Sequence, residues 1–243
     1  MNKKGQVTLF VIIAIVIVVL GFSFFMFKDK LFLKSSNIHT EEVSTFVQNC
    51  IEKSLPIVIN EIAESGGYFF SPKYSTESGT PYYYFNNYDL SPSLEQIESE
   101  LSENLEVLVS LCAEGSQNFT DLKVEFEEAN VFSKIEDNKI LFSVEYPVNI
   151  TKEENTYFLK DFGTFEQNTE FKKFYDISQK IILSIQQENS LCMSCFSNFA
   201  LENDLSINIE NPYNQTFIFS LQERNNLQNK FQLKFKFAIE YEN

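Results

Sequence analysis

The stretch that decides the fold class is LKVEFEEANVFSKIEDNKILFSVEY, residues 122–146, in which apolar side chains recur at every second position. The alternation runs through residues 122–126 and resumes at 140–146, after a turn at Asp137-Asn138. A period of two is typical of a strand with one buried face. We therefore expect an antiparallel hairpin whose apolar side packs against other elements.

On both sides of this hairpin the apolar residues are spaced by three and four, as on one face of a helix. We expect helices at residues 41–64, 91–112 and 171–187. Gly66-Gly67 should end the first helix, because glycine adopts left-handed backbone geometry readily. Pro56 lies inside that helix and is expected to bend or interrupt it.

Shorter runs predict the remaining strands. Aromatic runs at 68–70 and 81–85 suit an edge hairpin, and further strands are expected at residues 157–165, 205–209, 217–221 and 231–241. Helices and antiparallel strands in blocks, without regular alternation, indicate an α+β domain with helices packed on an antiparallel sheet.

The N-terminal region contains a candidate membrane anchor. From Val7 to Phe27 there are 21 residues without a charge, 16 of them Leu, Ile, Val or Phe. As a helix this segment is about 32 Å long, enough to cross a hydrocarbon core of roughly 30 Å. It exceeds the apolar stretch of a cleaved signal peptide, and its exit at Lys28-Asp29-Lys30 has no small-x-small cleavage site. We therefore expect one uncleaved transmembrane helix.

The orientation follows from other features, because lysines flank both ends of the span equally. A tail of six residues is easier to leave inside than a domain of about 200. Asn118, Asn149 and Asn214 each begin an Asn-x-Thr sequon, a candidate glycosylation site on an exterior domain. We expect a cytoplasmic tail at 1–6, the helix at 7–27 in the lipid bilayer, a linker at 28–40 and an extracytoplasmic α+β domain at 41–243.

A resemblance supports this arrangement. The stretch KKGQVTLFVIIAIVIVV resembles the class III signal peptide of archaeal type IV pilin-like proteins, in which a prepilin peptidase cuts before the Gln. The resemblance implies a cut between Gly5 and Gln6. Phe10 stands where pilins generally carry a Glu that is associated with filament assembly. The whole chain also looks like a group of archaeal single-pass surface proteins, on elements that include Gly66-Gly67-Tyr68, the Pro81–Tyr84 strand and the Phe237–Tyr241 ending.

The charge of the chain excludes one class of partner. Beyond residue 34 there are 14 basic and 33 acidic residues, a net charge of −19. Affinity for nucleic acids rests mainly on cationic contacts to phosphate, so we expect neither DNA nor RNA binding. The lipid bilayer and other surface proteins are the expected partners.

Four cysteines allow three disulfide pairings, of which we favour Cys50–Cys112 with Cys192–Cys195. Two buried free thiols at Cys50 and Cys112 are the alternative. The Cys192-Met193-Ser194-Cys195 motif is also compatible with a redox site or half of a zinc site. A redox motif should open a helix after a strand, whereas this one follows a predicted helix, and a zinc site needs two more ligands. A local structural disulfide is therefore expected.

Other catalytic and metal-binding patterns are missing from the sequence. The single histidine, His39, lies in a polar juxtamembrane stretch, and there is no glycine-rich phosphate loop. The acidic pairs Glu41-Glu42, Glu127-Glu128 and Glu153-Glu154 lack the alternating oxygen ligands of a calcium loop. We expect no cofactor, no metal and no enzymatic activity.

Three functions remain open. The first is a cell-surface structural or adhesive protein, pilin-like at its start. The second is an extracytoplasmic ligand-binding module or a subunit of an envelope complex. The third is an extracytoplasmic thiol enzyme that uses Cys192 and Cys195. We rank them in this order, because the anchor, the acidic domain and the shortage of catalytic motifs favour the first.

Overall fold

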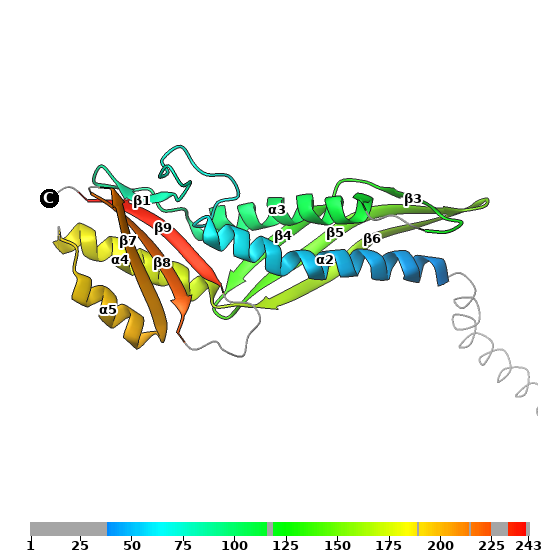
Figure 1. Cartoon of the computed structure of the whole chain (residues 1–243). Helices are drawn as coiled ribbons and strands as arrows, with labels where there is room; N and C mark the ends of the chain where they lie inside the picture. Colours follow the sequence, from blue (N-terminus) through cyan, green and yellow to red (C-terminus); the bar gives the residue numbers. More distant parts are fainter. Residues whose placement is uncertain (1–37, 116–118, 189, 214, 225–232, 242–243) are drawn as a thin grey trace, which may run out of the picture. The chain divides into compact units, whose positions relative to one another are not determined.

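The computed structural model describes residues 38–115, 119–188, 190–213, 215–224 and 233–241 (Figure 1). The predicted span from Val7 to Phe27 and the tail before it lie outside the described residues. Among the helices that the structure does describe, none is long and apolar enough to cross a membrane. The chain divides into two compact units, residues 1–45 and 46–243, and both sheets belong to the second.

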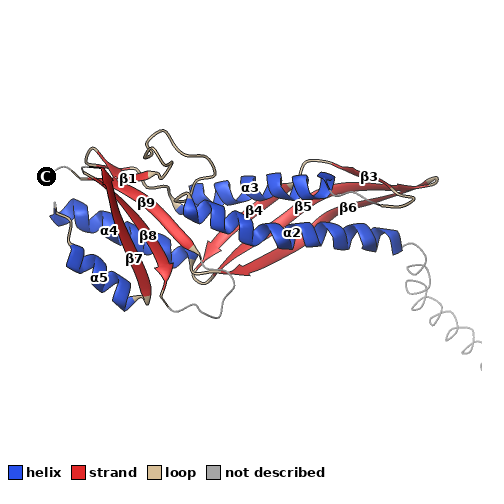
Figure 2. Cartoon of the chain, viewed as in Figure 1, coloured by secondary structure: helices blue, strands red, loops and turns tan. Residues whose placement is uncertain are grey.

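The described helices and strands follow one another in blocks (Figure 2). In chain order they are α2 (Ile38–Glu64), β1 (Tyr82–Phe85), β2 (Tyr88–Asp89), α3 (Leu94–Gly115), β3 (Lys123–Phe126), β4 (Asn130–Glu136), β5 (Lys139–Lys152), β6 (Asn155–Asn168), α4 (Phe171–Glu188), α5 (Met193–Glu202), β7 (Leu205–Tyr213), β8 (Thr216–Glu223) and β9 (Lys234–Glu240). This organisation confirms the expected α+β class. The helix α5 is an addition that sequence periodicity did not predict.

The helices α2 and α3 run antiparallel and are cross-linked. Cys50 of α2 is bonded to Cys112 of α3, and the Asn104 amide of α3 donates a hydrogen bond of 3.4 Å to Glu61 of α2. The helix α2 continues through Pro56, so the expected interruption does not occur. Its neighbours Leu55, Val58 and Ile59 are buried, and we attribute the continuity to the burial of this apolar stripe, which offsets the lost backbone hydrogen bond.

The start of α3 is fixed by reciprocal capping. The Ser93 hydroxyl accepts a hydrogen bond from the Gln96 amide, and the Gln96 side chain accepts one from the Ser93 amide. This capping box satisfies two backbone donors that the first turn leaves without partners. The helix therefore begins at Leu94, three residues later than the sequence pattern predicted.

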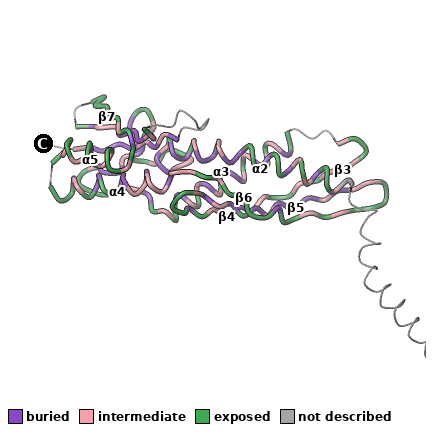
Figure 3. Tube along the Cα trace, turned by 90° about the horizontal axis from the view of Figure 1, so that it is seen from below, coloured by how far each residue is buried: buried purple, intermediate pink, exposed green. Residues whose placement is uncertain are grey.

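The first sheet is organised around β5. The strand β6 pairs with β5 along its length on one side, while β4 and then β3 pair with it on the other. The expected hairpin across Asp137-Asn138 is present, but its first strand is β4 rather than residues 122–126. The segment 122–126 instead provides β3, which pairs with residues 148–151. Buried positions recur along α2, α3 and β5, whereas most of β6 is exposed (Figure 3).

The free edge of β4 is covered by side chains of α3. Backbone amides of Val131, Ser133 and Ile135 donate to Glu106, Ser102 and Glu98 respectively, at 2.8–2.9 Å. Four helical residues advance about 6 Å and two strand residues about 6.8 Å, so the two spacings match. A polar stripe of the helix thus replaces the next strand.

The second sheet has the order β2-β1-β9-β8-β7, with β1 and β9 parallel and the other pairs antiparallel. The expected hairpin between residues 68–70 and 81–85 is wrong, because β1 pairs with β2 through a turn at Asn86-Asn87. Both turn residues have positive φ, as a tight two-residue hairpin requires.

An aromatic core holds the second sheet together. Tyr83 stacks on Phe237 with a centroid distance of 4.9 Å, and Phe237 stacks on Phe219 at 5.1 Å. All three side chains are fully buried. The helices α4 and α5 pack against β9 and β7 of this sheet. Several of the 26 phenylalanines of the sequence therefore belong to this core.

The glycines after α2 terminate the helix as predicted. Gly66 and Gly67 have φ values of +57° and +84°. A Cβ atom on Gly66 would lie 2.5 Å from the Lys236 carbonyl oxygen of β9. The Gly66 carbonyl accepts a hydrogen bond from the buried Tyr83 hydroxyl. This turn therefore joins α2 closely to the second sheet, in a space that only glycine fits.

Candidate functional site

The Cys192–Cys195 motif lies at the beginning of α5. Cys192 is the N-cap residue of this helix, and Cys195 lies in its first turn. The sequence argument against a redox site did not foresee the helix α5. The motif does follow the helix α4, as expected, but it also opens a helix, which is the position where a thiolate is stabilised best.

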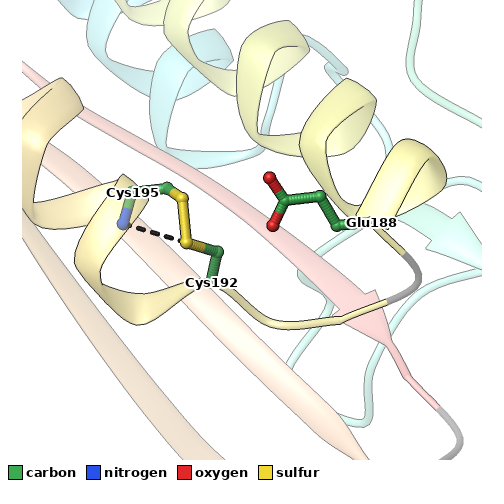
Figure 4. Close-up of side chains that lie close together, drawn as sticks. All are labelled: Glu188, Cys192 and Cys195. Atoms are coloured by element: carbon green, nitrogen blue, oxygen red, sulfur yellow. Dashed lines mark hydrogen bonds between the residues drawn. A yellow bond between two sulfur atoms is a disulfide. The ribbon is translucent and has the colours of Figure 1, made fainter.

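The two cysteines form a disulfide whose surroundings are polar (Figure 4). The Cys192 sulfur accepts a hydrogen bond of 3.2 Å from the Cys195 backbone amide. The Ser194 hydroxyl lies 3.5 Å from the same sulfur. Both cysteines are half-buried, so the sulfurs are held by the fold and yet lie close to solvent.

A carboxylate lies beside this disulfide. Glu188, at the end of α4, directs its side chain toward the two sulfurs (Figure 4), and an oxygen of it lies within 4.8 Å of each. Within the described residues this is the one group of three close side chains of metal-ligand type. The closed disulfide leaves neither sulfur as a thiolate ligand, so this arrangement does not coordinate a metal. Only after reduction would these residues offer three donor atoms.

Two grooves flank the helix α5. One lies between α5 and β7 and has a volume of about 470 Å³; its lining includes Met193, Leu201 and Ile207. The other lies between α4 and α5, has a volume of about 450 Å³ and is lined in part by Leu183 and Cys195. Leu183, Met193 and Leu201 are each at least half exposed. The disulfide therefore lies next to accessible apolar surface.

The two disulfides differ in what they connect. Cys50–Cys112 joins two helices across 62 residues of sequence, which on the chain-entropy model stabilises the fold by about 4 kcal/mol. Cys192–Cys195 closes a separation of three residues inside one helical turn, for which the same model gives about 2 kcal/mol. The pairing is the one that sequence analysis favoured. Only the first pair links separate elements.

Three exposed aromatic side chains belong to the segment between α2 and α3. Phe70 is 77% exposed and Tyr88 is 70% exposed, and Tyr74 is also exposed. Tyr83 and Tyr84, from the aromatic run noted in the sequence, are buried instead. We call Phe70, Tyr74 and Tyr88 the aromatic surface. Large exposed side chains of this kind are enriched where proteins contact partners.

Two phenols, Tyr83 and Tyr213, have pKa values above that of free tyrosine. Complete burial raises the pKa of Tyr83 well above its ordinary value, with smaller contributions from neighbouring phenols and Asp89. On the surface, a hydrogen bond of 2.8 Å to Glu77 raises the pKa of Tyr213. Both phenols are therefore neutral hydrogen-bond donors at physiological pH.

The other residues singled out in the sequence are dispersed. Asn149 lies on β5, half-buried, and its amide donates to Glu127 at 3.1 Å. Asn118, Asn214, Gly5 and Gln6 lie outside the described residues. His39 belongs to the first turn of α2. Glu153-Glu154 forms the exposed turn between β5 and β6.

Comparison with family models, with curated proteins and with solved structures finds no match for this chain. The described residues offer two features through which the protein could react with or bind another molecule. These are the disulfide at α5 with its grooves and the aromatic surface.

Proposed function

We propose that this protein is a membrane-anchored, extracytoplasmic structural or adhesive surface protein, with the anchor at Val7 to Phe27 and the N-terminus inside. The observation that carries the proposal is the pair of disulfides in the α+β domain, which leaves no free cysteine among the described residues. Disulfides persist in oxidising compartments and are rare in the cytosol. An uncharged span before such a domain fits a surface anchor.

The aromatic surface supports the adhesive part of the proposal. Phe70 and Tyr88 expose most of their side chains in a domain whose net charge is strongly negative. Aromatic rings bind sugars and protein surfaces through area and stacking rather than through charge. A domain that repels acidic surfaces at long range can still adhere through such rings at short range.

A second candidate is the extracytoplasmic ligand-binding module. The grooves beside α5 favour it, because they are concave, partly apolar and include polar groups such as Arg224. Their volumes lie within the range of small-molecule sites. A ligand held there would protect α5 and β7 from hydrogen exchange, whereas adhesion through the aromatic surface would protect residues 68–90.

The location is tested on whole cells and by mass. We expect protease added to intact cells to remove the domain, and the intact mass of the purified protein to show four cysteines in disulfides. A mass without Met1 to Gly5 would add pilin-type processing. If the domain is digested only after lysis and its thiols are free, the surface assignment is wrong.

The adhesive role is tested with a matched pair of variants. Phe70→Ser with Tyr88→Ser should reduce attachment of cells that display the protein. Phe132→Ser is the control, because Phe132 is also highly exposed, at 63%, but lies on β4 of the other sheet. Equal attachment by all three strains would remove the aromatic surface from the proposal.

A further inference from the structure

We propose that Cys192–Cys195 is a redox-active disulfide that accepts electrons from a dithiol segment of another protein. The activity would be thiol–disulfide exchange, and the substrate class is a polypeptide with two reduced cysteines close in sequence. This goes beyond a structural or adhesive role and does not depend on it. Three independent features of the site support it.

The first feature is that the fold does not need this bond. Both cysteines belong to the cap and first turn of α5, and the amide of Cys195 already ties the turn to the Cys192 sulfur. The other disulfide, by contrast, holds two helices together. A disulfide that opens without releasing a helix or a strand can be reduced and oxidised repeatedly, because both forms of the chain keep the same fold.

The second feature is the stabilisation of the Cys192 sulfur, which is the leaving group in the second step of the exchange. Anionic sulfur on Cys192 would accept the hydrogen bond of the Cys195 amide and lie at the positive end of α5. Ser194 adds a hydroxyl 3.5 Å away. Stabilising the thiolate favours the reduced form of such a pair and makes the disulfide a better oxidant.

The third feature is a carboxylate proton acceptor, Glu188, in a groove through which a partner thiol can reach the disulfide. Glu188 lies within 4.8 Å of both sulfurs and is exposed, so an incoming thiol can reach it. The groove between α4 and α5 includes both Glu188 and Cys195. Exposed Leu183 lines that groove, and exposed Met193 lies on the other side of α5. This surface suits an extended peptide with apolar side chains beside its cysteines better than it suits a small charged thiol.

The exchange balances in two steps. A partner thiol gives its proton to Glu188 and attacks the Cys192 sulfur; the disulfide breaks, its electron pair goes to the Cys195 sulfur, and that sulfur takes the proton from Glu188. The second partner thiol then loses its proton to Glu188 and attacks the partner sulfur in the mixed disulfide. The electron pair goes to Cys192, which Glu188 or water protonates. The partner is oxidised to a disulfide and this chain is reduced to a dithiol.

The test uses the oxidised full chain in detergent, without oxygen, and a reduced synthetic peptide Leu-Cys-Gly-Ser-Cys-Leu as probe. We expect the peptide to form its disulfide about tenfold faster or more than with the same concentration of glutathione disulfide. Mass spectrometry should locate the new thiols at Cys192 and Cys195, with Cys50–Cys112 still closed. The Cys195→Ser variant, mixed with a peptide whose second cysteine is replaced by serine and whose first is activated as a mixed disulfide, should keep a stable adduct on Cys192.

Glu188 is tested by its effect on pH dependence. Glu188→Gln should slow the reaction roughly tenfold near neutral pH and less at high pH, where the peptide thiol ionises without help. Glu154→Gln, an exposed carboxylate in the β5–β6 turn, is the matched control and should change neither rate nor profile. Oxidation of the peptide no faster than by glutathione disulfide would overturn the proposal, as would reduction at Cys50–Cys112 first. Equal reduction by glutathione and by the peptide would overturn the assignment of a polypeptide substrate.

Discussion

Opening the two disulfides one at a time should destabilise the domain unequally. The variant Cys192→Ser/Cys195→Ser retains only the bond between α2 and α3, and Cys50→Ala/Cys112→Ala retains only the bond in α5. For each variant the oxidised and the reduced protein are compared, so that the effect of the substitutions themselves cancels.

The magnitudes follow from the separations in sequence. Reduction of Cys50–Cys112 releases a loop of 62 residues and should lower the free energy of unfolding by about 4 kcal/mol. Reduction of Cys192–Cys195 releases a separation of three residues and should lower it by about 2 kcal/mol at most, because the cap hydrogen bond already restricts the turn. The gap of about 2 kcal/mol corresponds to roughly a thirtyfold ratio of equilibrium constants.

Urea unfolding of the full chain in mild detergent, followed by circular dichroism, measures both differences. The midpoints should separate, and the slope should rise on reduction, more for Cys50–Cys112 than for Cys192–Cys195, because the longer loop lets the unfolded chain expand further. Equal losses for the two bonds would refute the reasoning, because they would mean that Cys192–Cys195 holds more of the structure than its own turn.

Three further predictions concern single residues. Gly66→Ala should lower the free energy of unfolding by about 2–4 kcal/mol, because its Cβ would lie 2.5 Å from the Lys236 carbonyl oxygen in addition to the strain of positive φ. Gly163→Ala, where φ is also positive but the space is open, should lower it by about 1 kcal/mol, and thermal unfolding compares the two variants. Burial raises the pKa of Tyr83 in the folded state, so the unfolded chain loses its phenolic proton first, near pH 10, and stability falls as pH rises above that value. Tyr83→Phe should remove this pH dependence, which amounts to at most about 1.4 kcal/mol per pH unit, in urea titrations at pH 9 to 11. Glu98→Ala should leave the Ile135 amide without its acceptor, cost about 1–3 kcal/mol and accelerate hydrogen exchange at that amide; unchanged exchange would contradict the described contact.

Local periodicity was sufficient to predict elements whose buried face is continuous. The helices α2 and α4 and the strands β6 and β8 lie close to where apolar spacing placed them. Pro56 was misjudged because propensity is local, while the burial of the surrounding helix face depends on the tertiary structure. The strand β4 was missed as the partner across the turn because its alternation is broken, with polar Ser133 between Val131 and Ile135 on the inner face and apolar Phe132 on the outer face.

Contacts between distant segments could not be predicted from spacing. The parallel pairing of β1 with β9 joins residues about 155 apart, and nothing in either segment indicates the other. The helix α5 has one fully buried side chain, Phe196, so it lacks an apolar stripe. The proximity of Glu188 to the disulfide depends on the position of α5, so it could not be predicted either. The cysteine pairing was accessible in advance, because few cysteines leave few alternatives.

The polar ladder between α3 and β4 also limits how the molecule can add to another sheet. Amides that would recruit a foreign strand at β4 are occupied by Glu98, Ser102 and Glu106. The strand β6, at the opposite side of β5, pairs with β5 alone among the described strands. A foreign strand would therefore meet occupied amides along β4, whereas the long strand β6 pairs on its inner side only among the described strands. Assembly by strand addition through this sheet would thus be directed to β6 rather than to β4.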